Sequence, residues 1–168
     1  MAIRNIRQQG DEILTKECKA LKNVSLRTKI LIKDMFETMY DAYGVGLAAP
    51  QVGILRQVCV IDIGDEENRD PHVFINPVIT YEEGEQTGDE GCLSLPGQYG
   101  AVTRPMKVKV RAYDINMNEF ELEAEGLLAR AICHETDHLH GKMFTELVEG
   151  ELHGPQDNEE EEENEDDN

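Results

Sequence analysis

The sequence has no tryptophan, few basic residues and no long apolar segment. Aromatic residues make up 5% of its 168 residues, and 16 lysines and arginines stand against 35 aspartates and glutamates. No apolar run reaches the roughly 18–20 residues that span a bilayer. The first ten residues hold two arginines but no continuous apolar segment, so they do not predict a signal peptide. We therefore expect a cytoplasmic protein with no membrane partner.

Cysteines are also few, and they are widely spaced. The four of them are Cys18, Cys59, Cys92 and Cys133. They could pair in three ways. In a chain without an export signal, this spacing favours free thiols or a metal ligand over a disulfide framework.

The negative charge is concentrated at the C-terminal end. Ten of the 35 acidic residues lie in residues 151–168, which leaves about −9 of the net −19 for the rest of the chain. Residues 157–168 contain no apolar side chain, so we expect residues 151–168 to form a disordered acidic tail and residues 1–150 to form a single domain. Neither part shows the basic face that a phosphate backbone requires, and we expect no direct nucleic-acid binding.

Hydrophobic periodicity predicts two helices separated by strands. Apolar residues recur every four positions over residues 25–43, which predicts a helix that starts at Ser25 and ends at Gly44. A period of two then predicts strands over residues 57–63, 72–76, 78–85, 107–113 and 120–124, with a break at Pro77 and a hairpin loop at 114–118. Strands framed by an early and a late helix predict an α+β fold with mainly antiparallel sheets.

The late helix carries the pattern His-Glu-x-x-His. His134 and His138 are four residues apart, so their imidazoles lie one turn apart and can converge on one divalent transition metal. Glu135 can reach a water on that metal without being a ligand. The same pattern also occurs on solvated helices. Here apolar residues flank it and Gly141 offers a C-cap, which indicates a buried helix.

A glycine-rich segment at residues 89–97 predicts an irregular loop that offers a third ligand. Cys92 could be a small core residue. As a thiolate beside His134 and His138, it would instead complete a three-ligand site with an open fourth position, which is typical of catalytic metals.

Two other functions fit the same residues. A zinc endopeptidase would take its third ligand from a later glutamate, for which the chain has little room. A metal-buffering or structural module would need a closed site that recruits Cys133 or His140. Helical spacing places both of these on other faces of the helix, which favours a core thiol and a surface histidine.

Another glycine-rich segment, Gly44–Gly53, predicts either a tight turn or a binding loop beside which Gln51 could place its amide.

Three motifs, GVGLAAPQ, EGCLSLPG and HETDH, follow one another along the chain in this order. With them, the chain resembles the bacterial-type peptide deformylase family over roughly residues 1–145. The resemblance implies a single catalytic domain over residues 1–150 that removes the formyl group from the N-terminal formylmethionine of new polypeptides and releases formate. It also implies one Fe²⁺ per chain, for which Zn²⁺, Ni²⁺ or Co²⁺ can substitute.

The resemblance also implies roles for individual residues. Three positions match the family's metal ligands: Cys92, His134 and His138. Glu135 matches its acid/base, and Gln51 with the backbone N–H of Leu93 matches the groups that stabilise the oxyanion. Positions that match substrate-binding residues are Val45, Gly46, Tyr99 and Leu127. Glu90 and Arg104 match a pair that braces the cysteine loop.

The C-terminal end departs from the family pattern. Certain members end in a basic helix that contacts the ribosome, whereas residues 146–168 here are acidic. We expect N-formylmethionyl nascent peptides as partners. Any transient proximity to the ribosome would not involve this tail, because ribosomal RNA would repel it.

Overall fold

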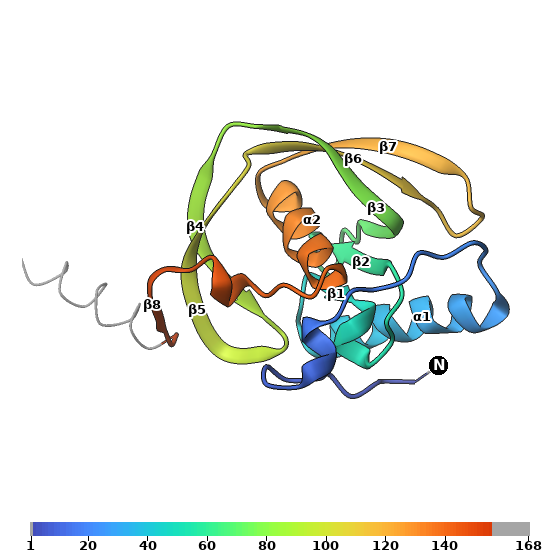
Figure 1. Cartoon of the computed structure of the whole chain (residues 1–168), viewed down its shortest axis with the longest axis horizontal. Helices are drawn as coiled ribbons and strands as arrows, with labels where there is room; N and C mark the ends of the chain where they lie inside the picture. The colour runs from blue at the N-terminus through green and yellow to red at the C-terminus, as the bar shows by residue number, and fades with distance from the viewer. Residues whose placement is uncertain (1, 156–168) are drawn as a thin grey trace, which may run out of the picture.

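The computed structural model describes residues 2–155 and shows an α+β fold (Figure 1). Its elements, in chain order, are η1 (Glu12–Thr15), α1 (Leu26–Asp41), β1 (Gly46–Ala48), η2 (Ala49–Val52), β2 (Val58–Asp62), β3 (Pro71–Glu83), β4 (Gln86–Cys92), β5 (Leu95–Arg104), β6 (Lys107–Tyr113), β7 (Glu119–Glu125), α2 (Gly126–Leu139), η3 (Phe144–Glu146) and β8 (Glu149–His153). The predicted fold class is confirmed. No helix of the described part is long and apolar enough to cross a bilayer.

The strands form two antiparallel sheets around α2. The larger sheet has the order β1-β2-β3-β6-β7, and the smaller has the order β4-β5-β8. In Figure 1, α2 lies in the middle of the molecule, with β4 and β5 on one side and β1 and β2 on the other. Nearly every residue of α2 from Ala129 to Leu139 is buried, as its apolar flanks predicted. The helix therefore carries its His pair into the interior.

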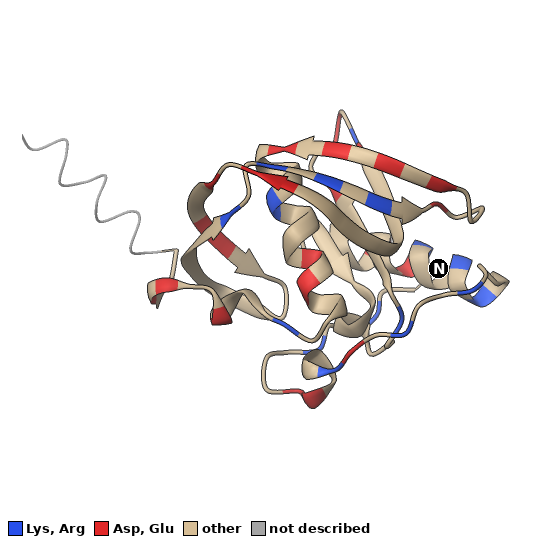
Figure 2. Cartoon of the chain, turned by 45° about the horizontal axis from the view of Figure 1, so that its top comes forward, with Lys and Arg blue, Asp and Glu red and all other residues tan. Residues whose placement is uncertain are grey.

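The β6–β7 hairpin follows the predicted alternation. Val108, Val110 and Ala112 are buried on its inner face. On the outer face the basic residues of β6 lie beside the acidic residues of β7, which Figure 2 shows as neighbouring blue and red bands. Lys107 pairs with Glu123 there. Strict alternation fixes this register because a slip of one residue would expose the apolar face.

Helix α1 begins as predicted but ends differently. The Ser25 hydroxyl accepts the N–H of Thr28 at 3.2 Å and caps the first turn. The helix ends at Asp41 rather than at Gly44. Tyr43 takes the left-handed conformation, with φ +57°, and the Gly44 N–H donates to the carbonyl of Met39 at 2.9 Å. Gly44 instead provides space, because a Cβ there would overlap the side chain of Leu93.

The predicted break at Pro77 is wrong, because β3 runs through it as one strand. The register shifts between Ile75 and Val78, and Asn76 adopts a positive φ of 51°. The Asn76 amide makes two 2.8 Å hydrogen bonds with the backbone of Leu21, which holds this bulge in place. Because a bulge leaves one residue out of the ladder, the strand tolerates the proline.

The structure also describes two segments for which the sequence predicted no strand. Residues 89–97 form the tip of the β4–β5 hairpin, in which Cys92 ends β4 and pairs with Leu95 of β5. The expected boundary between residues 150 and 151 falls inside β8, which pairs with β5, so residues 151–153 belong to the small sheet. Most of the segment expected to be disordered, residues 156–168, lies outside the described residues.

The end of α2 depends on Gly141, which has φ +73° as the C-cap prediction required. A Cβ at this position would overlap the carbonyl of Thr15 and lie 2.9 Å from the amide of Lys16. We predict that Gly141→Ala lowers the free energy of unfolding by more than the roughly 1–2 kcal/mol that left-handed backbone costs an alanine. Denaturant unfolding measures this change.

The control is Gly150→Ala. Gly150 also has a positive φ, 81°, but no heavy atom lies within 4 Å of its Cβ position. It should lose only the backbone contribution. Equal losses in the two variants would show that the contact with Thr15 is unimportant.

Candidate metal centre and catalytic cleft

Three donor atoms from β4 and α2 meet at one point. The Cys92 Sγ lies 3.3 Å from the Nε2 of His138, which in turn lies 3.2 Å from the Nε2 of His134. All three atoms lie within 4.8 Å of one another, and this is the one such group among residues 2–155. One thiolate and two imidazoles suit a divalent transition metal. Since the chain brings three ligands together, a fourth position can serve a water or a substrate.

Both histidines are buried, at 8% exposure for His134 and 1% for His138. Burial lowers the pKa of His138 well below its usual value, which favours the neutral imidazole that metals require. The Nδ1 of His134 lies 2.5 Å from the Glu90 carboxylate. Because Nδ1 donates to this carboxylate, Nε2 is the nitrogen that faces the other two donor atoms.

The Glu90 carboxylate forms hydrogen bonds with three side chains. Besides His134, it accepts two hydrogen bonds from Arg104, at 2.7 and 3.2 Å, and one from Arg130 at 2.8 Å. Arg104 also pairs with Asp137 on α2 at 2.7 Å. Burial alone would raise the pKa of Glu90, but the hydrogen bonds from His134 and Arg104 outweigh it and lower that pKa to about 2. The expected Glu90–Arg104 pair is thus part of a larger network.

The amide of Gln51 is fixed beside the sulfur. Its Oε1 accepts the N–H of Ala48 at 2.9 Å, which orients the Nε2 toward the small sheet. The Nε2 donates to the Ser94 hydroxyl at 3.0 Å and lies 3.5 Å from the Cys92 Sγ. A side-chain N–H is therefore held next to the three donor atoms. Leu93, whose N–H the sequence singled out, follows Cys92 directly.

The carboxylate of Glu135 is buried, and its hydrogen bonding is incomplete. Glu135 is 4% exposed, and its Oε1 has no hydrogen-bond partner among the described residues. Burial raises its pKa to about 7. A Cβ at Gly46 would overlap its Oε2, so the glycine makes room for the carboxylate. Such a group can accept and return a proton near neutral pH.

A cleft of about 490 Å³ lies between α2, the β4–β5 hairpin and the segment after α1, and its lining includes Cys92, His134 and Glu135. The four predicted substrate-binding residues, Val45, Gly46, Tyr99 and Leu127, all lie in its lining, together with Glu135 and Gln51. The side chains of Val45 and Leu127 are half-exposed. The cleft thus has a buried polar end and an open, largely apolar mouth.

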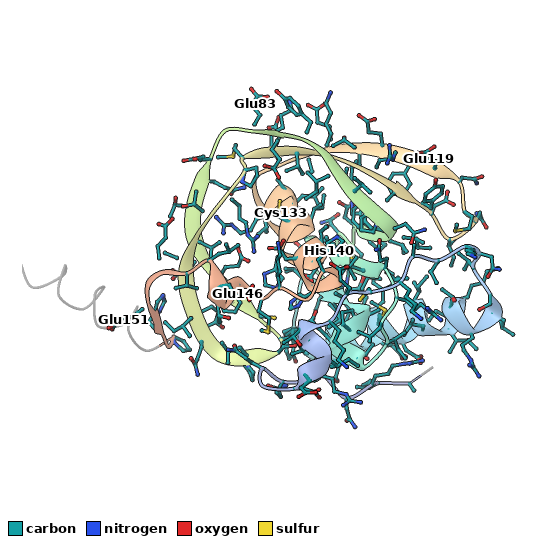
Figure 3. The ribbon with its side chains drawn as sticks, viewed as in Figure 1. Glu83, Glu119, Cys133, His140, Glu146 and Glu151 are labelled. Atoms are coloured by element: carbon teal, nitrogen blue, oxygen red, sulfur yellow. The ribbon has the colours of Figure 1, made fainter. Side chains whose placement is uncertain are left out.

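The other candidate ligands lie outside the site. Cys133 is buried in the core, and burial raises the pKa of its thiol to about 12. His140, near the end of α2 (Figure 3), lies at the surface and pairs with Glu17 at 3.0 Å. Cys18 and Cys59 are free and buried as well. A closed four-ligand site that recruits Cys133 or His140 is therefore not formed.

Sequence reasoning missed three residues that support the site. Arg130 pairs with Glu90 and also donates to the carbonyl of Val102 at 3.0 Å. Asp137 holds Arg104, and Ser94 holds Gln51. Arg130 and Asp137 lie one turn from His134 on α2, so the helical period was a signal that could have found them.

The chain is similar to known proteins over most of its length. The model of the family described as polypeptide deformylase matches residues 3–152. A peptide deformylase of Lachnoclostridium phytofermentans is 58% identical over 97% of this chain and 99% of the relative. Among solved structures, peptide deformylases from Legionella pneumophila (46% identity, TM-score 0.84, 88% of this chain and 87% of the other) and Thermotoga maritima (36%, 0.85, 89% and 100%) are similar.

The Glu90 network predicts how stability depends on pH. A carboxyl group whose folded pKa is about 2 instead of 4.5 stabilises the fold fully above pH 4.5 and loses that effect as the pH falls toward 2. The shift corresponds to about 3 kcal/mol. We predict that Glu90→Gln lowers the free energy of unfolding by about this amount at pH 7 in metal-free protein, as measured by urea unfolding.

The difference between wild type and Glu90→Gln should shrink between pH 4.5 and 2. A difference that stays constant over this range would contradict the assigned pKa. Glu123→Gln serves as the control, because Glu123 makes an exposed pair with Lys107 that solvent screens, and its loss should change stability little.

Proposed function

Because this chain belongs to the polypeptide deformylase family, we propose which of its residues perform that family's reaction. Members of the family are metal-dependent hydrolases that remove the formyl group from nascent peptides. The proposal rests on one observation. Next to three convergent atoms that can ligate a metal lies the buried carboxylate of Glu135, one oxygen of which has no hydrogen-bond partner among the described residues. We propose N-formylmethionyl nascent peptides as the substrate and formate as a product.

Cys92, His134 and His138 would hold one metal ion per chain. The fit is supported by their spacing and by the 2.5 Å contact of Glu90 with the outer nitrogen of His134, which is how metal-ligating histidines are usually oriented. We propose Fe²⁺, with Zn²⁺, Ni²⁺ or Co²⁺ able to substitute, because two imidazoles and a thiolate bind all four ions. A bound metal supplies a Lewis acid and lowers the pKa of water to about 7.

Glu135 would act as the acid/base. Its raised pKa of about 7 lets the carboxylate accept a proton from the attacking water and donate it to the departing amine. The Gly46 backbone packs against its Oε2, so the carboxylate cannot turn away in that direction. The same side chain would therefore transfer the proton in both steps, the attack of water and the departure of the amine.

The Gln51 amide and the backbone N–H of Leu93 would stabilise the oxygen of the formyl group as negative charge builds on it. Gln51 is held by Ala48 and Ser94 before substrate arrives, which orients its amide. The other N–H, now 3.5 Å from the Cys92 sulfur, would turn from that sulfur to the formyl oxygen. Preorganised donors of this kind each contribute about 100–1,000-fold in rate. Hydrogen bonding to Cys92 also ties this donor to the ligand sulfur.

Four residues would bind the substrate itself: Val45, Gly46, Tyr99 and Leu127. The apolar side chains of Val45 and Leu127 suit the methionine side chain, and Gly46 presents open backbone to the peptide. We further propose that residues 1–150, completed by the end of β8, act as a single catalytic domain in the cytoplasm. The acidic segment from residue 151 would make no contact with RNA.

The proposal predicts that Glu135→Gln lowers kcat for formate release from a formyl-Met peptide by at least about 100-fold. The change removes the proton acceptor but keeps the shape, so metal content should stay the same. The measurement is formate release together with elemental analysis after anaerobic purification, which also identifies the bound metal.

Glu121→Gln, exposed on β7, provides the matched control and should retain full activity. Formate release that survives Glu135→Gln would exclude Glu135 as the acid/base. A wild-type protein that binds metal but releases no formate would overturn the proposed function itself.

A further inference from the structure

Tyr43 occupies a backbone conformation that its side chain disfavours. It follows α1 with φ +57°, in the left-handed region where glycine or asparagine normally ends a helix. Its N–H donates to the carbonyl of Tyr40, and the next N–H, from Gly44, closes the helix on Met39. The adjacent glycine does not take the strained position. The fold therefore places a tyrosine where a smaller residue would be more stable.

Packing does not offset this strain. The side chain of Tyr43 is 92% exposed, the highest value among the exposed large apolar side chains of residues 2–155. By comparison, Tyr40, three residues earlier, donates its hydroxyl to Asp62 at 2.6 Å and stacks on Phe36. A non-glycine residue that is held in a strained conformation while its side chain stays exposed indicates a role outside the fold.

The position of Tyr43 indicates what that role is. It lines the catalytic cleft next to Gly44 and Val45. The residues that line the cleft differ in exposure, from 4% for Glu135 on α2 to 45% for Val45 and 92% for Tyr43 in the segment after α1. Since the buried groups would act on the formyl group, the exposed Tyr43 stands at the outer rim, along which the rest of a bound peptide would extend.

A second tyrosine stands at the same mouth, on a different element. Tyr99 of β5 is 37% exposed, and its ring lies 6.3 Å from the ring of His153 on β8. It also covers Gly91, where a Cβ would come within 2.7 Å of the Tyr99 ring. Tyr99 is thus held by the small sheet, whereas Tyr43 keeps its ring free. Both rings offer apolar faces to a peptide.

We propose that Tyr43 is a specificity-determining residue, which packs its ring against an apolar or aromatic side chain two or three residues beyond the formylated methionine. The proposal rests on the proposed function, because it assigns a contact to the same substrate. It explains why strain and exposure coincide at this one residue. An aromatic contact of this kind contributes about 2–10-fold in binding.

The test compares Tyr43→Gly and Tyr43→Asn with the wild-type enzyme on three substrates: formyl-Met, formyl-Met-Ala-Gly-amide and formyl-Met-Ala-Phe-amide. Both replacements suit a left-handed backbone and remove the ring. We expect KM for the phenylalanine peptide to rise about 2–10-fold with kcat unchanged, and little change for the other two substrates. Thermal unfolding should show no loss, and relief of strain should raise Tm by up to roughly 2–4 °C.

Two controls separate the ring from other effects. Tyr43→Phe keeps the ring and should retain the preference for the phenylalanine peptide. Tyr81→Ala removes another half-exposed tyrosine, which lies on β3 outside the cleft, and should change no substrate.

The proposal is overturned if all three substrates lose activity equally, if none is affected, or if Tm falls by several degrees. The last result would make Tyr43 a structural residue. If the wild-type enzyme deformylates none of the three, the proposed function fails instead.

Discussion

The structure of the site depends on the charge balance around Glu90. This carboxylate comes from β4, and its partners come from β5 (Arg104) and α2 (Arg130 and His134). A buried carboxylate with three cationic or hydrogen-bonding partners fastens the small sheet to the helix, because removing any partner leaves a charge that the interior cannot solvate. The attachment places Cys92, two residues after Glu90, beside the His pair. One electrostatic constraint thus positions the three candidate metal-ligating groups, which come from two separate elements.

The second constraint is the close approach of two side chains to the backbone, which two glycines permit. Gly46 of β1 leaves space for the Glu135 carboxylate, and Gly44 leaves space for Leu93 at the tip of the β4–β5 hairpin. The two halves of the cleft meet at these positions. Burial at this junction raises the pKa of Glu135 toward neutrality, so the packing that closes the cleft also adjusts the protonation of this carboxyl group.

Local patterns predicted those elements whose causes are local. Ser25 and the four-residue repeat predicted α1, and strict alternation predicted the β6–β7 hairpin. Predictions failed where a distant segment decides the outcome. The strand through Pro77 depends on a bulge that Leu21 supports, and β8 exists because β5 offers it an open edge. The acidic composition of this segment suggested a tail. Composition carries no information about whether a partner strand is available, so it could not predict the strand.

The sequence by itself determined the pairing of His134 with His138 and the neighbouring position of Glu135, because the helical period brings residues four apart to one face. It also indicated the family, through three motifs in a fixed order. Only the tertiary structure decided that the Cys92 sulfur meets a nitrogen 46 residues away, and that Glu90 holds Arg130 and His134. No local interaction spans such separations, so those contacts exist only once the small sheet has packed against α2.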